Sequence, residues 1–404
     1  MTGVLSGIRV AAFTHFAAGP RVAQFLGALG ADVVKVEPPA GEASRVLIRD
    51  AEGRFAGQSS SFVTLNRNQR GIALDLKSPG GREAARRLVD GADVLVENFK
   101  PGALKRLGFG YDDLKADHPR LIYCPVSGYD PRGPKAAALG QDMLLQGASG
   151  MASLTGRDGQ SPTPVGVFAI DAYTAMINVI AILCALRHRD ATGEGQLVHA
   201  DMMSSGLHMM MEEASYVMNI DPVTRKGRHY AGHSLSLSPY GAYDAKDGSF
   251  VLSVATAEQM KVLAAELGLT GEIGPYLTTA GQRRHKDEIG AALVRRFAQM
   301  TVAEIEAKVA KAGIWMGPVR SLIDALEDPA VAATGLIGRH ESPFFPPHRF
   351  VREPLTLAAA PLGPGRPAPG LGEHTREVLG ELGYTRAEIE TLIADGAAVA
   401  APTS

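Results

Sequence analysis

The sequence predicts an α/β fold: a doubly wound, mostly parallel sheet in a large Rossmann-like domain, joined to a smaller α+β domain. Three observations lead to this prediction. Short β-branched runs alternate with helical patterns through the first half of the chain, as in parallel α/β proteins. After about residue 225 the pattern changes to a hairpin followed by helices. A connector rich in proline and glycine then precedes two short helical patterns near the C-terminus.

The first strand, helix and strand are predicted from "IRVAAF", "RVAQFLGAL" and "ADVVKVE". The turn between the first strand and the helix, Thr14 to Pro20, lacks the G-x-G-x-x-G fingerprint of dinucleotide sites. Such a turn still offers free backbone N–H groups and the positive end of a helix dipole. It therefore suits an anionic or nucleophilic group of a ligand, although the local sequence alone favours a tight strand-to-helix connection with an incidental histidine.

Later elements of the large domain follow the same pattern. Ser78 and Pro79 predict a helix start, with a hydroxyl cap before a first-turn proline. Strands are predicted for "DVLVENF", "RLIYCPVSGY" and Gln196 to Met202, the last one after a long apolar helix that starts near Asp171.

In the second half, Asp247-Gly248 lies between two alternating runs and predicts a hairpin. Helical patterns follow, then the extended "PFFPPHRFVREPLTL" and the connector "PLGPGRPAPGLG". We therefore expect a large domain over 1–224, a small α+β domain over 225–325, and a segment over 326–404 that returns to the large domain.

Composition excludes several classes of partner. Lysine and arginine number 41 against 43 aspartate and glutamate, so no strong field favours nucleic acid or a membrane surface. The longest apolar run, Ala175 to Leu186, is shorter than the ~20 residues of a membrane span, and the N-terminus has no signal pattern. The only cysteines, Cys124 and Cys184, have no disulfide or redox spacing, which indicates a cytoplasmic protein. No cluster has metal-ligand spacing, so no metal site is predicted.

Several motifs, in order, resemble the class III CoA-transferase family. They are "FTHFAAGP", "LGADVVKVEPP", "LNRNQRGIALDLKSPGG", "VLVENFKPGALKRLGF", "GPVRSLIDALEDPAV" and "LGEHTREVLGELGY". The family includes formyl-CoA:oxalate and carnitine CoA-transferases and the related α-methylacyl-CoA racemases. The resemblance spans residues 8 to about 395.

The resemblance implies that the N-terminal turn binds coenzyme A as a co-substrate, with no permanently bound cofactor. An adenine needs an apolar surface and the CoA phosphates need cations, which fits the residue types involved. Pro38 stands where some relatives have an arginine, and Arg45 is a candidate replacement. Taken singly, the basic residues of the set would be solvated surface charges. The implied CoA contacts are His15, Ala18, Leu74, Lys77, Asn98, Phe99, Lys100 and Arg106.

Asp171 lies between an apolar extended run and the long apolar helix. Locally it is a capping or first-turn aspartate. The resemblance implies instead that it is the nucleophile, which attacks an acyl-CoA to form an aspartyl anhydride and then an aspartyl-CoA thioester. The apolar neighbours of Asp171 suit a site that must exclude water. The predicted substrates are therefore an acyl-CoA and a carboxylic acid.

Racemisation and CoA binding without catalysis are the alternatives to CoA transfer. In the racemase branch a histidine precedes the aspartate, but this chain has Gln141 there, which favours transfer over racemisation because glutamine cannot carry a proton. Gln141 and His233 are candidate substrate contacts. The loop 228–241 either covers the site or is a plain linker, and it lacks the long glycine run of formyl-CoA:oxalate enzymes. A non-catalytic CoA-binding protein is the third possibility.

The resemblance also implies an interlocked homodimer.

Overall fold

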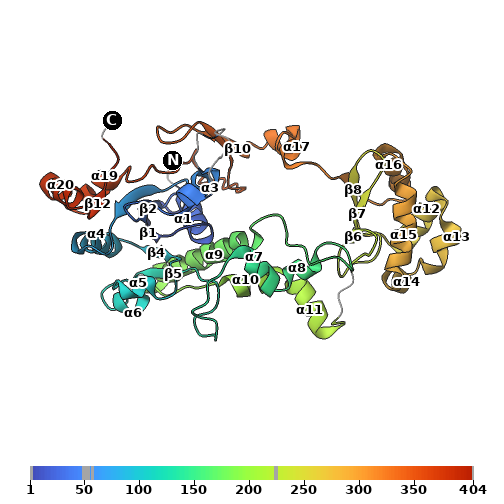
Figure 1. Ribbon diagram of the computed structural model, residues 1–404, viewed down its shortest axis with the longest axis horizontal. Coiled ribbons are helices and arrows are strands. Elements are labelled where there is room, and N and C mark those ends of the chain that lie inside the picture. The colour runs from blue at the N-terminus through green and yellow to red at the C-terminus, as the bar shows by residue number, and fades with distance from the viewer. Residues whose placement is uncertain (1–2, 48–54, 56–58, 223–225, 403–404) are drawn as a thin grey trace. The chain divides into compact units, whose positions relative to one another are not determined.

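The structure is a computed structural model that describes residues 3–47, 55, 59–222 and 226–402 (Figure 1). The chain forms two compact units. The first is drawn from Met1–Leu145, Phe168–Ser205 and Pro329–Ser404, and the second from Gln146–Val167 and Gly206–Asp328. The three-segment division at residues 224 and 325 stays a prediction.

A six-stranded sheet forms the centre of the first unit. Its strand order is β12-β3-β2-β1-β4-β5, and all neighbours pair in parallel except β12 with β3. The predicted α/β fold with a largely parallel sheet is thereby confirmed. The strands are β1 (Arg9–Phe13), β2 (Asp32–Glu37), β3 (Arg70–Leu74), β4 (Val94–Glu97), β5 (Ile122–Pro125) and β12 (Ala398–Val399).

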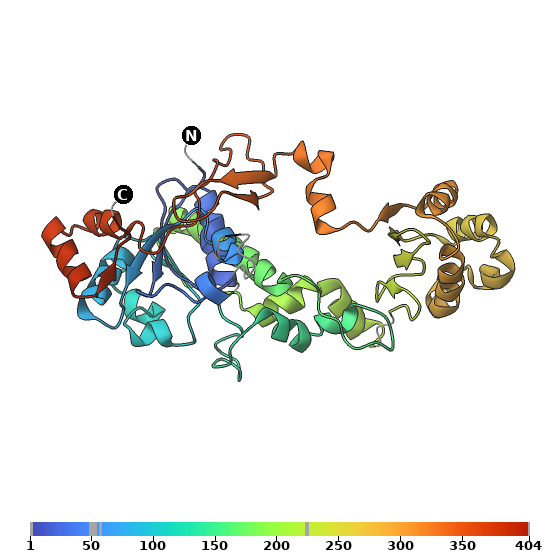
Figure 2. The same cartoon turned by 45° about the horizontal axis from the view of Figure 1, so that its top comes forward.

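Helices cover both faces of this sheet (Figures 1 and 2). On one face, α1 (Ala18–Ala28) and α9 (Ala169–Thr192) pack together over β1, β4 and β5. On the other face lie α4 (Pro79–Asp90), α5 (Ala103–Arg106), α6 (Tyr111–Leu114), α19 (Thr375–Glu381) and α20 (Arg386–Ala394). The first unit also contains α2 (Ser44–Leu47), α3 (Ser60–Leu65), α18 (Pro329–Ala332), β10 (Ile337–His340) and β11 (His348–Val351).

Helix α9 has 24 residues, and by length and composition it could cross a membrane, with a mean hydropathy of 1.9 in its most apolar window. Half of that window is buried. Ala175, Val179 and Ile182 lie in the core between α9, α1 and the sheet. We therefore interpret the apolar character of α9 as that of a core helix.

The second unit has an antiparallel sheet of order β6-β7-β8-β9, covered by helices. The predicted hairpin is confirmed, because β7 and β8 pair on either side of Asp247-Gly248. The elements are α8 (Met151–Leu154), α11 (Met211–Asn219), β6 (Ala231–Gly232), β7 (Gly241–Asp244), β8 (Ser249–Leu252), α12 (Ala257–Leu267), α13 (Thr270–Ile273), η1 (Gly274–Tyr276), α14 (Thr279–Arg284), α15 (Lys286–Phe297), α16 (Val302–Lys311), β9 (Met316–Pro318) and α17 (Leu322–Leu326). Two helices cross the division between the units, α7 (Asp142–Ala148) and α10 (Met202–Met209).

The prediction of a strand over Gln196–Met202 is wrong. Only a single parallel bridge, from Leu197 to Tyr123, forms there. The side chain of Asn178 in α9 takes the place of a further strand partner, since its amide N–H donates to the Ala200 carbonyl at 2.9 Å and its oxygen accepts the Ala200 N–H at 3.1 Å. Met202 then starts α10.

Candidate active site

The turn after β1 lies where the strand order of the sheet reverses. Strand β1 has β2 on one side and β4 on the other, and the chain leaves β1 for α1 on one face and β4 for α5 on the other. In open α/β sheets, ligands bind at the carboxyl ends of the strands at such a switch point. The turn Thr14–Ala17 and the segment Asn98–Phe99 both lie at this edge.

Asn98 holds the turn in place. The His15 N–H donates to Asn98 Oδ1 at 2.9 Å, and Asn98 Nδ2 donates to the His15 carbonyl at 2.9 Å. A Cβ atom on Gly19 would lie 2.7 Å from the Asn98 side chain, so only glycine permits this approach. The Phe99 ring lies 5.5 Å from the His15 ring between centroids. The structure therefore brings three predicted residues, His15, Asn98 and Phe99, into one cluster.

Two buried charged side chains form hydrogen bonds to the backbone of the turn after β1. Lys35 is fully buried, and its Nζ donates to the Thr14 carbonyl at 2.7 Å and pairs with Glu42 at 2.8 Å. Glu42 in turn accepts the N–H of Phe16 at 2.9 Å. Phe16 has a left-handed backbone, with φ of 61°, which is unfavourable for an aromatic residue. This ion pair therefore fixes a strained turn.

His15 presents a polar atom without a protein partner. Its Nδ1 is buried and makes no hydrogen bond among the described residues. Burial lowers the pKa of His15 below its ordinary value, so the ring is neutral near pH 7. A neutral imidazole can accept or donate one hydrogen bond to a ligand in this turn.

Next to Phe99, Glu97 ends β4 with a carboxylate that accepts the Phe99 N–H at 2.9 Å. Burial raises the pKa of Glu97 to about 7. Its position helps to fix the aromatic ring that faces His15.

Asp171 lies in the first turn of α9 and is half-buried. Its backbone N–H donates to Oδ2 of Asp142 at 2.9 Å, and Asp142 is 2% exposed. Burial and the negative charge of Asp142 raise the pKa of Asp171 to about 6, while the positive charge of Arg21 acts in the opposite direction. A carboxylate in this setting is poorly solvated, which makes it a better nucleophile than an exposed one.

Asp142 is placed by the loop before it. Gly128 and Gly140 pack backbone to backbone, since a Cβ atom on Gly140 would lie 2.3 Å from the Gly128 Cα. The loop then enters α7 with Asp142 in its first turn.

Five residues at or beneath this site were not predicted from the sequence. Asp142 was part of the Gly140-Gln141-Asp142 segment, and Arg21 directly follows Pro20, but neither showed a local signal of its role. Lys35 inside the apolar strand β2 and Glu97 at the end of β4 do carry a signal in the sequence, because buried charges require partners. The five residues are Arg21, Lys35, Glu42, Glu97 and Asp142.

The other predicted CoA contacts differ in accessibility. Ala18 is buried at the start of α1, and Lys77, Lys100 and Arg106 are exposed. Leu74 is 1% exposed and belongs to the core beneath α4 and α19, so it offers no accessible surface to a ligand.

Arg45 is already engaged with the protein. It donates two hydrogen bonds of 2.7 Å to the Glu37 carboxylate and one of 3.0 Å to the Pro369 carbonyl. Its guanidinium also lies 3.8 Å from the centre of the Phe62 ring.

The two predicted substrate contacts lie in different units. Gln141 is exposed in the first unit, directly before α7. His233 lies in the second unit, where it pairs with Glu213 at 3.4 Å and stacks on Tyr240.

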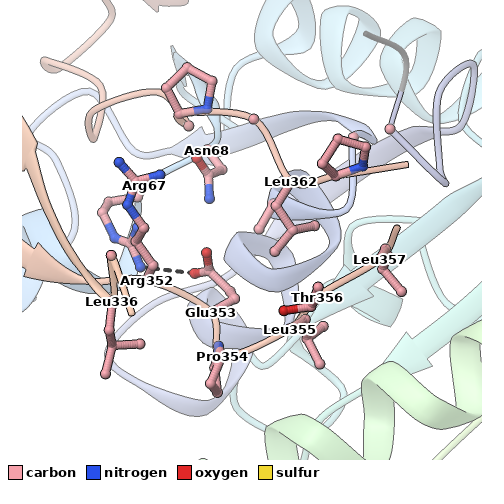
Figure 3. A pocket seen from close by; sticks show the side chains of 18 of the residues that line it. Arg67, Asn68, Leu336, Arg352, Glu353, Pro354, Leu355, Thr356, Leu357 and Leu362 are labelled. Carbon is pink, nitrogen blue, oxygen red and sulfur yellow. Dashed lines mark hydrogen bonds and ion pairs between the residues drawn. The ribbon is translucent and has the colours of Figure 1, made fainter. Parts of the chain in front are cut away.

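A cavity of about 650 Å³ in the first unit is separate from these residues (Figure 3). Arg67 in its wall pairs with Glu353 at 2.9 Å and lies over the Phe350 ring. Leucines and prolines of 354–364 form much of the remainder. None of the predicted site residues lines it. In the described part of the chain, no group of three or more His, Cys, Asp or Glu side chains could hold a metal ion.

Comparison with known proteins gives consistent matches over nearly the whole chain. The succinate–glutarate CoA-transferase of Agrobacterium fabrum is 34% identical over 389 residues, which cover 94% of this chain and 95% of that protein. The formyl-CoA:oxalate CoA-transferase of Rhodopseudomonas palustris is 32% identical, covering 100% and 99%. A crystal structure of a CAIB/BAIF family protein from Brucella suis superposes with a TM-score of 0.81 and 31% identity, covering 95% and 100%.

The sequence model described as CoA-transferase family III matches residues 5–375. The resemblance inferred from the motifs is thereby confirmed. The chain belongs to CoA-transferase family III, and it is an enzyme of the CoA-transferase type.

Proposed function

We propose that this enzyme moves CoA from an acyl-CoA donor to a carboxylic acid acceptor, with Asp171 as the covalent carrier. The observation that supports this most is the half-buried carboxyl group of Asp171, whose pKa is raised to about 6 by burial and by Asp142. Its position in the first turn of α9 adds the positive end of a helix dipole. The names of the relatives point to short carboxylic acids as substrates.

The reaction proceeds through two anhydrides and one thioester. The Asp171 carboxylate attacks the donor thioester, and the C–S bond breaks to give a mixed anhydride and the CoA thiolate. The thiolate attacks the aspartyl carbonyl of the anhydride, which releases the donor acid and leaves an aspartyl-CoA thioester. The acceptor carboxylate then attacks this thioester and expels the thiolate. The thiolate finally attacks the acyl carbonyl of the second anhydride, which releases the new acyl-CoA and the Asp171 carboxylate.

Coenzyme A binds along the turn after β1 in this proposal. The aromatic rings of His15 and Phe99 form an apolar wall, and the N-terminus of α1 faces the ligand. Lys77, Lys100 and Arg106 are exposed cations available to the phosphates, whereas Arg45 would first have to leave Glu37. Gln141 and His233 remain candidate substrate contacts.

We also propose that the enzyme works in the cytoplasm as an interlocked homodimer. Large apolar side chains lie exposed just before and within α7 and at the start and middle of α9, which supports an interface there. These side chains are Leu139, Met143, Leu144, Phe168 and Ile180.

The proposed function is tested by incubating the enzyme with acyl-CoA and acid pairs and measuring the products by mass spectrometry. Succinyl-CoA with glutarate and formyl-CoA with oxalate are the first pairs to use. We expect a new acyl-CoA in at least one pair. Deuterium exchange at the α-carbon of an acyl-CoA without any acceptor acid would contradict transfer and favour racemisation. Tight CoA binding without turnover of any pair would favour a binding protein.

The rate should depend on pH through Asp171. Because the carboxylate is the nucleophile and its pKa is about 6, kcat/KM for the acyl-CoA should fall about tenfold per pH unit below pH 6. Glu97 titrates near pH 7, so the profile of Glu97→Gln serves as the control and should keep the limb near 6. An acid limb near pH 4 in both proteins would contradict the assignment.

Asn98→Ala should weaken CoA binding more than it slows chemistry. It removes two hydrogen bonds that hold the His15 backbone, each worth roughly 1 kcal/mol, so KM for the acyl-CoA should rise about 30-fold. The exposed Asn219 in α11 gives the matched control, since Asn219→Ala should leave KM unchanged. Steady-state kinetics and CoA titration calorimetry measure both effects. A KM within twofold of wild type would show that this turn does not bind CoA.

A further inference from the structure

Arg21 lies at the same sheet edge as Asp171. Helix α1 follows directly from the carboxyl end of β1, so its first turn, with Arg21, is at that edge. Helix α9 runs in the same direction, because Arg189 in its last turn pairs with Asp93 at the opposite edge, 2.9 Å away. The two helices pack against each other (Figure 1). Val22 of α1 and Ala175 of α9 belong to the same core cluster. The first turns of α1 and α9 are therefore neighbours.

Three charges meet between these turns. The positive charge of Arg21 in α1 interacts electrostatically with the carboxyl groups of Asp171 in α9 and Asp142 in α7. The guanidinium is half-buried, yet among the described residues no hydrogen bond or close ion pair holds it. Asp142, in contrast, is committed to the Asp171 backbone N–H. A partly desolvated cation with free donors beside a nucleophile is available for a ligand anion.

The proposed chemistry carries one negative charge from start to finish. The charge begins on the Asp171 carboxylate, passes to the CoA thiolate when the anhydride forms, and then to the released donor acid. The acceptor acid brings it back, the thiolate holds it again, and Asp171 recovers it. Asp171 is neutral while it is acylated, so the negative charge of Asp142 and the positive charge of Arg21 then cancel. The guanidinium can therefore attract the carboxylate of the incoming acid.

We propose that Arg21 is a further catalytic residue: its guanidinium is the fixed countercharge for this travelling negative charge, and it binds the carboxylate of the acceptor acid as that acid attacks the aspartyl-CoA thioester. This inference depends on the proposed function. Preorganised charges aimed at a developing anion are among the largest contributions to enzyme rates.

The test compares Arg21→Gln and Arg21→Lys with wild type. Loss of the charge in Arg21→Gln should lower kcat by about 10²-fold and raise KM for the acceptor acid, while KM for the acyl-CoA stays within twofold. Arg21→Lys should restore most of the rate. Arg187→Gln is the control, since Arg187 is exposed on α9 and should leave activity unchanged.

Two readouts separate a catalytic from a structural role. The acid limb of the kcat/KM profile should move above pH 6 in Arg21→Gln, because Asp142 and burial then act on Asp171 without the opposing cation. Quenched mass spectra at saturating substrates should also show more aspartyl-CoA enzyme, since attack by the acceptor becomes slow.

A kcat within twofold of wild type, or a rise only in KM for the acyl-CoA, would overturn the role of Arg21. Asp171→Asn is measured in parallel. If Asp171→Asn is inactive and Arg21→Gln fully active, the inference about Arg21 fails alone. If Asp171→Asn keeps full activity, the proposed function itself fails.

Discussion

Asp171→Asn is expected to lower kcat for CoA transfer by more than about 10³-fold, because the amide cannot form the anhydride or the thioester. Asparagine has nearly the same shape, and the backbone N–H that donates to Asp142 is kept. Asp190→Asn is the matched control, since Asp190 is exposed near the other end of α9. It should stay within twofold of wild type. Transferase assays with purified proteins measure both.

The loss of activity should occur without loss of stability. The folded-state pKa of Asp171, about 6, lies above its ordinary value of 3.8, so the folded protein binds the proton more tightly than the unfolded chain. The stability contributed by this group is therefore gained as pH falls through 6 and is absent at pH 7. A neutral asparagine removes the buried charge, so at pH 7 Asp171→Asn should unfold at the same urea concentration as wild type or higher. If Asp171→Asn is inactive and also clearly destabilised, the result does not support the assignment of Asp171 as the nucleophile.

The second large effect is expected at Lys35. Lys35→Met leaves Glu42 as an uncompensated charge that is only 3% exposed, and it also frees the Thr14 carbonyl. Breaking a buried ion pair in this way typically costs about 3–5 kcal/mol in the free energy of unfolding. Urea unfolding followed by circular dichroism measures the change.

Two control variants make this prediction specific. Lys35→Met combined with Glu42→Gln removes the unpaired charge and keeps an oxygen for the Phe16 N–H, so it should be more stable than Lys35→Met alone. Arg87→Gln breaks an exposed pair with Glu83 and should leave the midpoint of unfolding unchanged. If Lys35→Met unfolds like wild type, the buried pair does not support the turn.

Local patterns were sufficient for many elements of the fold. The Ser78 side chain caps α4 with Pro79 in its first turn, as predicted, because a cap depends on neighbouring residues only. The hairpin at Asp247-Gly248 is a second case. The strand predicted over Gln196–Met202 failed because Asn178, far away in sequence, satisfies the Ala200 peptide group.

The candidate site depends on contacts between distant segments. The clamp between His15 and Asn98 joins residues 83 apart, and the contact between Asp142 and Asp171 joins residues 29 apart. No local pattern indicates such pairs. Motif resemblance identified His15, Asn98 and Asp171 as candidates, but the Arg21 and Asp142 charges emerged only once α1, α7 and α9 were placed at one edge of the sheet.

Covalent catalysis by Asp171 is best tested by mass spectrometry of the enzyme after incubation with a donor acyl-CoA, followed by rapid quenching or by hydroxylamine. We expect CoA to add covalently to the peptide containing Asp171, and hydroxylamine to convert that carboxyl to a hydroxamate. An enzyme that transfers CoA while this peptide stays unmodified at every time point, or that carries the hydroxamate on another residue, would contradict covalent catalysis by Asp171.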